Sequence, residues 1–166
     1  MENYRNPLIF VIEDNPVYND LVTGILKSKH FDNLLSFRNP EECLKEIHQN
    51  PDIVILNYAY SGFTGLDLMK KVHQTRPKVT FIFLSGQNSV EVAVGIMRQG
   101  AFDYIVKNEK APDHLVSAIR LAISGEKRQS VRKGLRWGAV LLFLLILFLF
   151  IVILSLGLFS EQFRLF

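Results

Sequence analysis

The longest uncharged run of the chain spans residues 137–159, WGAVLLFLLILFLFIVILSLGLF, and holds 23 residues without an acid or a base. A helix rises about 1.5 Å per residue, so this run would cover roughly 34 Å, enough to cross a hydrocarbon core of about 30 Å. Core helices of globular domains rarely contain so long an apolar run. We therefore predict a transmembrane helix over residues 137–159, which leaves residues 1–125 for one globular domain.

The basic residues around this run predict its orientation. Residues 126–136 form a linker with five of them, and the tail at 160–166 holds only Arg164. The five are Lys127, Arg128, Arg132, Lys133 and Arg136. The positive-inside rule then places residues 1–125 in the cytoplasm of a single-pass protein, with the linker beside anionic lipid. The single Cys43 agrees with a reducing compartment.

Several function classes are disfavoured by composition. Residues 1–125 carry 13 Lys and Arg against 14 Asp and Glu, and this near-neutral balance argues against binding of nucleic acid. His30, His48, His73 and His114 lack the spacing of zinc ligands. No Ser/His/Asp or Cys/His arrangement suggests a nucleophilic enzyme. We predict no enzymatic activity.

Residues 1–125 alternate between two hydrophobic periodicities. Short apolar runs predict strands at Leu8–Ile12, Leu34–Phe37, Ile53–Leu56, Val79–Leu84 and Tyr104–Val106. Apolar stripes predict helices with Val17, Leu21, Ile25 and Leu26; Cys43, Leu44 and Ile47; Leu66, Met69 and Val72; Val90 to Met97; and Leu115, Ile119, Leu121 and Ile123. This alternation predicts an α/β fold, a doubly wound five-stranded parallel sheet of the flavodoxin-like type.

Polar residues follow four of the predicted strands. Glu13 and Asp14 follow the first strand, Asn57 the third, Ser85 the fourth and Lys107 the fifth. Ligands of such sheets bind beyond the carboxyl ends of the strands, so we expect these side chains to meet in one crevice. A flavodoxin-like nucleotide site is the competing interpretation, but an acidic pair after the first strand would repel phosphate.

With this order and spacing, the sequence resembles the receiver domain of two-component response regulators over about residues 7–124. The matching segments are IFVIEDNP, DIVILN, FLSG and GAFDYIVK, with Gly65 eight residues beyond Asn57. The resemblance implies a bacterial phosphorelay protein in which the acidic pair holds Mg²⁺, the Asn57 position accepts a phosphoryl group, and Ser85 and Lys107 contact its oxygens. It also implies that Tyr104 is the aromatic residue that reports the state of the site.

The chain departs from this pattern at its centre. Asn57 stands where the family has the phosphoacceptor aspartate, and an amide lacks the nucleophilic oxygen that attack on phosphorus needs. Tyr60-Ser61 replaces the family's usual Met-Pro, so the following loop has also diverged. We therefore predict a pseudo-receiver that is not phosphorylated at this site.

The remaining crevice residues have open alternatives. Glu13, Asp14 and the Asn57 carbonyl could bind Mg²⁺ weakly, since one formal charge has been lost, or Lys107 could form a salt bridge with the acidic pair. Ser85 could be a turn residue, and Tyr104 could simply fill space beside its strand.

The preferred function is a membrane-anchored, phosphorylation-independent interaction module at the bacterial inner membrane. We expect it to bind a protein partner through the face formed by the fourth helix (Val90 to Met97), the fifth strand (Tyr104–Val106) and the fifth helix, which runs from about Pro112 to Gly125. The alternatives are a receiver regulated by a ligand or by phosphorylation elsewhere, and a subunit of a larger membrane complex recognised through residues 137–159.

Overall fold

The computed structural model describes residues 6–60 and 62–125. The predicted basic linker at 126–136, the transmembrane helix at 137–159 and the tail at 160–166 lie outside the described residues. Within the part that is described, no helix combines the length and the apolar character that crossing a membrane requires.

A five-stranded parallel sheet forms the centre of the domain. Its strands are β1 (Ile9–Ile12), β2 (Leu34–Phe37), β3 (Ile53–Leu56), β6 (Thr80–Ser85) and β7 (Asp103–Val106). They lie in the order β2-β1-β3-β6-β7, with every neighbouring pair parallel. The predicted sheet is confirmed, with strand bounds that shift by at most one residue. The chain order reverses between β1 and β3, and this switch point is where ligands of such sheets bind.

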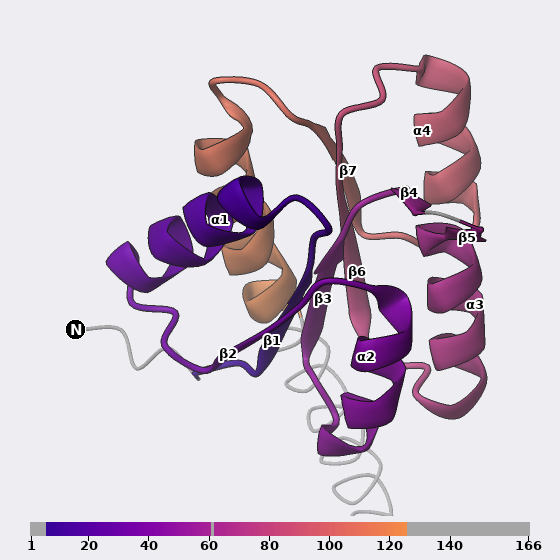
Figure 1. The fold of residues 1–166 in the computed structure, drawn as a ribbon, viewed down its shortest axis with the longest axis horizontal. Helices are drawn as coiled ribbons and strands as arrows, with labels where there is room; N and C mark the ends of the chain where they lie inside the picture. The colour runs from indigo at the N-terminus through magenta and orange to yellow at the C-terminus, as the bar shows by residue number, and fades with distance from the viewer. Residues whose placement is uncertain (1–5, 61, 126–166) are drawn as a thin grey trace, which may run out of the picture. The chain divides into compact units, whose positions relative to one another are not determined.

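Helices cover both faces of the sheet (Figure 1). On one face lie α1 (Pro16–Ser28) and a final helix over residues 111–125, which is orange and unlabelled in the figure. The other face is covered by α2 (Pro40–Glu46), α3 (Gly65–Thr75) and α4 (Val90–Arg98), and the short 3-10 helix η1 (Ile47–Gln49) continues α2. Asn15 and Asn39 cap α1 and α2, each followed by a proline suited to a first turn.

The central strands β1, β3 and β6 are buried on both faces because each contributes to two cores. Ile9 and Val11 pack with α1 and the final helix, whereas Phe10 and Ile12 pack with α2, α3 and α4. All four side chains are at most 1% exposed. This alternation explains why the strands appear in the sequence as continuous apolar runs.

Some of the predicted helical stripes are wrong in phase. Val17 is 78% exposed and Leu21 49%, while α1 buries Asn19 together with Val22 and Leu26. The Asn19 amide donates to the Glu13 and Phe37 carbonyl oxygens, so a polar residue occupies the buried face. Hydrophobic periodicity alone could not anticipate this.

The same error occurs in two other helices. Leu121 in the final helix is 63% exposed, and in α4 only Ile96 is fully buried, while Val90 is 76% exposed. Both helices nevertheless lie where the sequence predicts them.

The loop after β3 holds a small hairpin that hydrophobic periodicity does not predict. It consists of β4 (Ala59–Tyr60) and β5 (Phe63–Thr64), which pair as antiparallel strands. Two residues per strand are too few to produce a visible alternation. The hairpin fixes the position of Tyr60 at the carboxyl end of β3.

Candidate functional site

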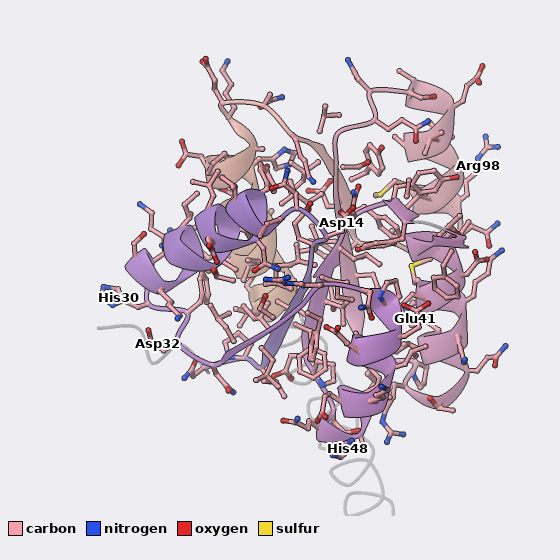
Figure 2. All side chains as sticks on the ribbon, viewed as in Figure 1. Asp14, His30, Asp32, Glu41, His48 and Arg98 are labelled. Carbon is pink, nitrogen blue, oxygen red and sulfur yellow. The ribbon has the colours of Figure 1, made fainter. Side chains whose placement is uncertain are left out.

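The predicted polar residues meet at the carboxyl edge of the sheet. Asp14 lies at the turn from β1 into α1, near the centre of the domain in Figure 2. The labelled His48 lies at the bottom of the domain in this view, and His30 lies at the end of α1. Within the described residues, no three His, Cys, Asp or Glu side chains cluster in a way that could hold a metal ion.

An ion pair between Glu13 and Lys107 crosses the crevice. The Lys107 Nζ lies 2.6 Å from Glu13 Oε2, and Glu13 as a residue is only 3% exposed. The same Nζ lies 4.3 Å from the centre of the Tyr18 ring, a cation–π contact. Burial, followed by the nearby charge of Glu13, raises the pKa of the Tyr18 phenol. The acidic pair is therefore divided: Glu13 is neutralised within the chain, whereas Asp14 is exposed.

Asn57 directs its side-chain oxygen to the neighbouring backbone. Its Oδ1 accepts a hydrogen bond of 2.8 Å from the Tyr58 N–H. The side chain is half-buried at the end of β3, the predicted position. An amide in this arrangement offers no ionised oxygen with which to attack phosphorus.

Tyr60 enters the crevice from the β4–β5 hairpin. Its Oη accepts a hydrogen bond of 2.8 Å from the Asn57 N–H and donates one of 2.9 Å to the Ile12 carbonyl oxygen. Burial raises the pKa of the phenol well above its usual range, the bond from Asn57 opposes this, and the charges of Glu13 and Asp14 add to it. The hydroxyl therefore stays protonated at neutral pH.

The sequence signal for this role was the aromatic residue three positions after Asn57. Tyr60-Ser61 departs from the family pattern, but nothing in the sequence predicts that the Tyr60 ring turns inward. Ser61 itself lies outside the described residues.

Ser85 and Tyr104 both contact the loop between β6 and α4. The Ser85 hydroxyl is buried and accepts a hydrogen bond of 3.2 Å from the Gln87 N–H, as a turn residue does. Tyr104 Oη donates a hydrogen bond of 2.7 Å to the Gln87 carbonyl oxygen, and its ring stacks on Phe83 with centroids 6.4 Å apart. The two residues thus fix this loop from the end of β6 and from β7.

The arrangement does not fit the Mg²⁺ ion that the family resemblance implies. Of the three expected oxygen donors, Glu13 is paired with Lys107 and the Asn57 Oδ1 is bonded to the Tyr58 N–H. The Ile12 carbonyl oxygen beside them is bonded to Tyr60. Mg²⁺ requires several well-placed oxygen ligands, and of the three expected donors only the Asp14 carboxylate is exposed and makes no hydrogen bond or ion pair within the described residues.

The fold and the order of the crevice residues define a receiver-type domain, and comparison with known proteins agrees. The family model for the response regulator receiver domain matches residues 9–120. This chain belongs to the response regulator receiver domain family.

Two curated relatives illustrate the similarity. YesN of Bacillus subtilis, described as an uncharacterized transcriptional regulatory protein, is 33% identical over 130 residues, covering 75% of this chain and 34% of that protein. The nitrogen assimilation regulatory protein NtrX of Azorhizobium caulinodans is 28% identical over 128 residues, covering 75% of this chain and 28% of that protein. The chain therefore spans about a third of the length of these relatives.

Solved structures show the same fold. A response regulator receiver domain protein from Clostridium thermocellum superposes with a TM-score of 0.66 at 27% identity, covering 73% of this chain and 97% of that one. NtrX from Brucella abortus superposes with a TM-score of 0.68 at 30% identity, covering 77% of this chain and 30% of that one.

Proposed function

We propose that this chain is a pseudo-receiver, anchored in the bacterial inner membrane, that acts through protein contacts and has neither a phosphorylation switch nor enzymatic activity. The observation that carries this proposal is Asn57 at the end of β3, where its side-chain oxygen is bonded to the Tyr58 N–H. Receivers signal through an acyl phosphate at this position, and an amide cannot form one.

The other crevice residues support the proposal because their polar groups bond within the chain. Lys107 pairs with Glu13, and the Ser85 hydroxyl accepts a bond from the Gln87 N–H. In the family, the equivalent lysine and hydroxyl contact the phosphoryl oxygens. Here they stabilise the domain in the state that the structure shows.

The proposed partner surface lies on α4, β7 and the final helix over 111–125. On α4, Val90, Val94 and Met97 are 76%, 43% and 42% exposed, and their spacing of four and three residues places them on one side of the helix. Phe102, just before β7, is 40% exposed. An exposed apolar stripe of this kind is a feature of protein interaction sites.

Phosphorylation is tested on the full-length chain in detergent, with a small acyl-phosphate donor and Mg²⁺, by intact mass. A receiver that retains the aspartate serves as the positive control under the same conditions. We expect no hydroxylamine-labile gain of one phosphoryl group. A stoichiometric gain at Asn57 would overturn the proposal.

Partner binding is tested by co-purification from the native membrane. We expect Val94→Asp/Met97→Asp to lose the partner, while the matched control Val17→Asp/Leu21→Asp, on the exposed side of α1, retains it. Retention by both variants, together with loss when residues 137–159 are replaced by an unrelated membrane helix, would instead indicate a complex subunit recognised through its membrane segment.

A further inference from the structure

We infer that Tyr60 is an internal occupant of the crevice, whose hydroxyl closes the space between the ends of β1 and β3 to a divalent cation. The inference rests on the proposed function, because it concerns how the crevice is maintained without Mg²⁺ or a phosphoryl group. It assigns to the chain a second change, beside Asn57, that separates this crevice from a phosphorylatable one.

The hydroxyl is inserted where the β1–β3 ladder ends. The Asn57 nitrogen lies 3.4 Å from the Ile12 carbonyl oxygen, long for a direct N–H···O bond. The Tyr60 Oη lies 2.8 Å from this nitrogen and 2.9 Å from this oxygen, so it bridges the two groups. A cation that used the Ile12 oxygen would first have to break a well-formed hydrogen bond from Tyr60 in a largely buried place.

The backbone around Tyr60 is fixed on both sides. Tyr60 pairs with Phe63 in the hairpin, and the Gly65 N–H donates a 2.7 Å hydrogen bond to the Tyr58 carbonyl oxygen. Thr64 caps the N-terminus of α3 with a capping box in which its side chain and backbone exchange hydrogen bonds with Asp67. The ring therefore enters the crevice from a folded hairpin, and removing it requires that hairpin to open.

The charges of the crevice agree with closure. Glu13 is paired with Lys107, and Asn57 contributes no charge, so of these three described residues Asp14 alone offers an exposed, unpaired charge. A hard cation needs several anionic or carbonyl oxygens. Restoring a carboxylate at position 57 alone would leave Tyr60 in place. We therefore expect tight cation binding only when both Asn57 and Tyr60 are replaced.

Mn²⁺ alone, measured by electron paramagnetic resonance on the full-length chain in detergent, tests this closure. We expect Asn57→Asp to bind Mn²⁺ weakly and Asn57→Asp/Tyr60→Met to bind at least about tenfold more tightly, because the hydroxyl no longer occupies the Ile12 oxygen. The matched control is Asn57→Asp/Tyr58→Met, which changes the adjacent tyrosine, and its affinity should equal that of Asn57→Asp. Equal affinities for all three variants would overturn the inference.

A second measurement covers the case in which the Met variant does not fold. Tyr60→Phe keeps the ring and removes only the hydroxyl, so the Asn57 N–H retains only the long contact to Ile12. We expect the backbone amide hydrogen of Asn57 to exchange about tenfold faster in Tyr60→Phe, and at an unchanged rate in the control Tyr58→Phe. An unchanged exchange rate of the Asn57 amide in Tyr60→Phe would show that the Tyr60 hydroxyl does not bridge the ends of β1 and β3.

The two proposals fail separately in these experiments. Phosphorylation of the unchanged chain would overturn the proposed function and leave the Mn²⁺ comparison intact. Equal Mn²⁺ affinities would overturn the role of Tyr60 while the unchanged chain still fails to accept a phosphoryl group.

Discussion

The Lys107 ammonium and the Glu13 carboxylate meet at 2.6 Å, although β1 and β7 are separated in the sheet by β3 and β6. The two side chains are 18% and 5% exposed, so the pair is largely withdrawn from water. It joins residues 94 positions apart in the chain. One side chain thus reaches across the crevice to neutralise the buried acid on the other side.

Removing only the cation should destabilise the domain. We expect Lys107→Met to lower the free energy of unfolding by about 3–5 kcal/mol, because the buried Glu13 carboxylate keeps its hydrogen bond from the Asn15 N–H but loses its countercharge. Urea denaturation followed by circular dichroism measures this. Glu13→Gln/Lys107→Met should recover most of the loss, and the exposed control Lys110→Met should change stability by less than about 0.5 kcal/mol. A loss as large in the double variant would contradict this account of the pair.

Restoring the carboxylate alone should not restore phosphorylation. We expect Asn57→Asp to remain without an acyl phosphate after incubation with a small phosphodonor and Mg²⁺, because Tyr60 still bonds to the backbone of residues 12 and 57. Intact mass before and after hydroxylamine measures the result. Full phosphorylation of this single variant would show that the loop after β3 tolerates the chemistry.

The buried Cys43 should make the domain sensitive to alkali. Burial raises the pKa of its thiol to about 12, whereas a thiol in an unfolded chain ionises near pH 8.5. A thiol whose pKa is higher in the folded than in the unfolded state stabilises the domain fully when the pH is below the unfolded-state pKa. This contribution declines as the pH rises toward the folded-state pKa. Between pH 8 and 10 we expect a loss of about 2 kcal/mol.

The control for this effect is Cys43→Ala. The quantity compared is the slope of the unfolding free energy with pH, not the stability at one pH. We expect the alanine variant to lose less stability between pH 8 and 10 in urea denaturation. Parallel slopes for the two proteins would rule out the thiol as the source.

Gly65 should not tolerate a side chain. A Cβ at this position would overlap the Asn57 carbonyl oxygen and press on Leu56 and Phe83. We expect Gly65→Ala to destabilise the domain by about 1–3 kcal/mol in thermal or urea unfolding. Gly95→Ala is the matched control, since a Cβ added there would meet nothing within 4 Å beyond the adjoining backbone of α4, and an alanine within α4 should be neutral or stabilising. A neutral Gly65→Ala would mean that the loop after β3 moves freely.

The basic linker should determine membrane orientation. Neutralising its five Lys and Arg residues to Gln should scramble the location of a reporter fused after Phe166, because the bias of the flanking charges is then lost. Five neutralised surface lysines elsewhere in residues 1–125 should leave it unchanged. Detection of the reporter in the cytoplasm when it is fused to the chain with its basic linker intact would contradict the predicted topology.

The sequence predicted the sheet well because each central strand is buried on both faces. The run at Ile53–Leu56 matches β3 residue for residue, and the run at Leu34–Phe37 matches the edge strand β2 in the same way although β2 is less buried. The helix faces were harder, since Asn19 is buried by its bonds to two backbone carbonyls while Val17 stays exposed. Polar burial of this kind depends on the tertiary structure and leaves no periodic signal.

In the crevice, residue types could be placed but their bonding could not. The order of strand ends brought Glu13 and Lys107 together, and a salt bridge was one of two alternatives. The inward turn of Tyr60 depends on a hairpin of two residues per strand, which sequence periodicity cannot resolve.

Under the proposed function, the pairing of the crevice groups within the chain would also limit how a signal passes through this domain. A receiver with an open carboxylate can carry a message in the fraction of molecules that is modified. Here the Asn57 Oδ1 accepts a hydrogen bond from the Tyr58 N–H and Lys107 is held by Glu13, so under the proposed function no phosphoryl group at position 57 distinguishes one copy from another. Under that proposal a partner would respond to how many copies are present and where in the cell they reside, which would make synthesis, degradation and placement the variables under control.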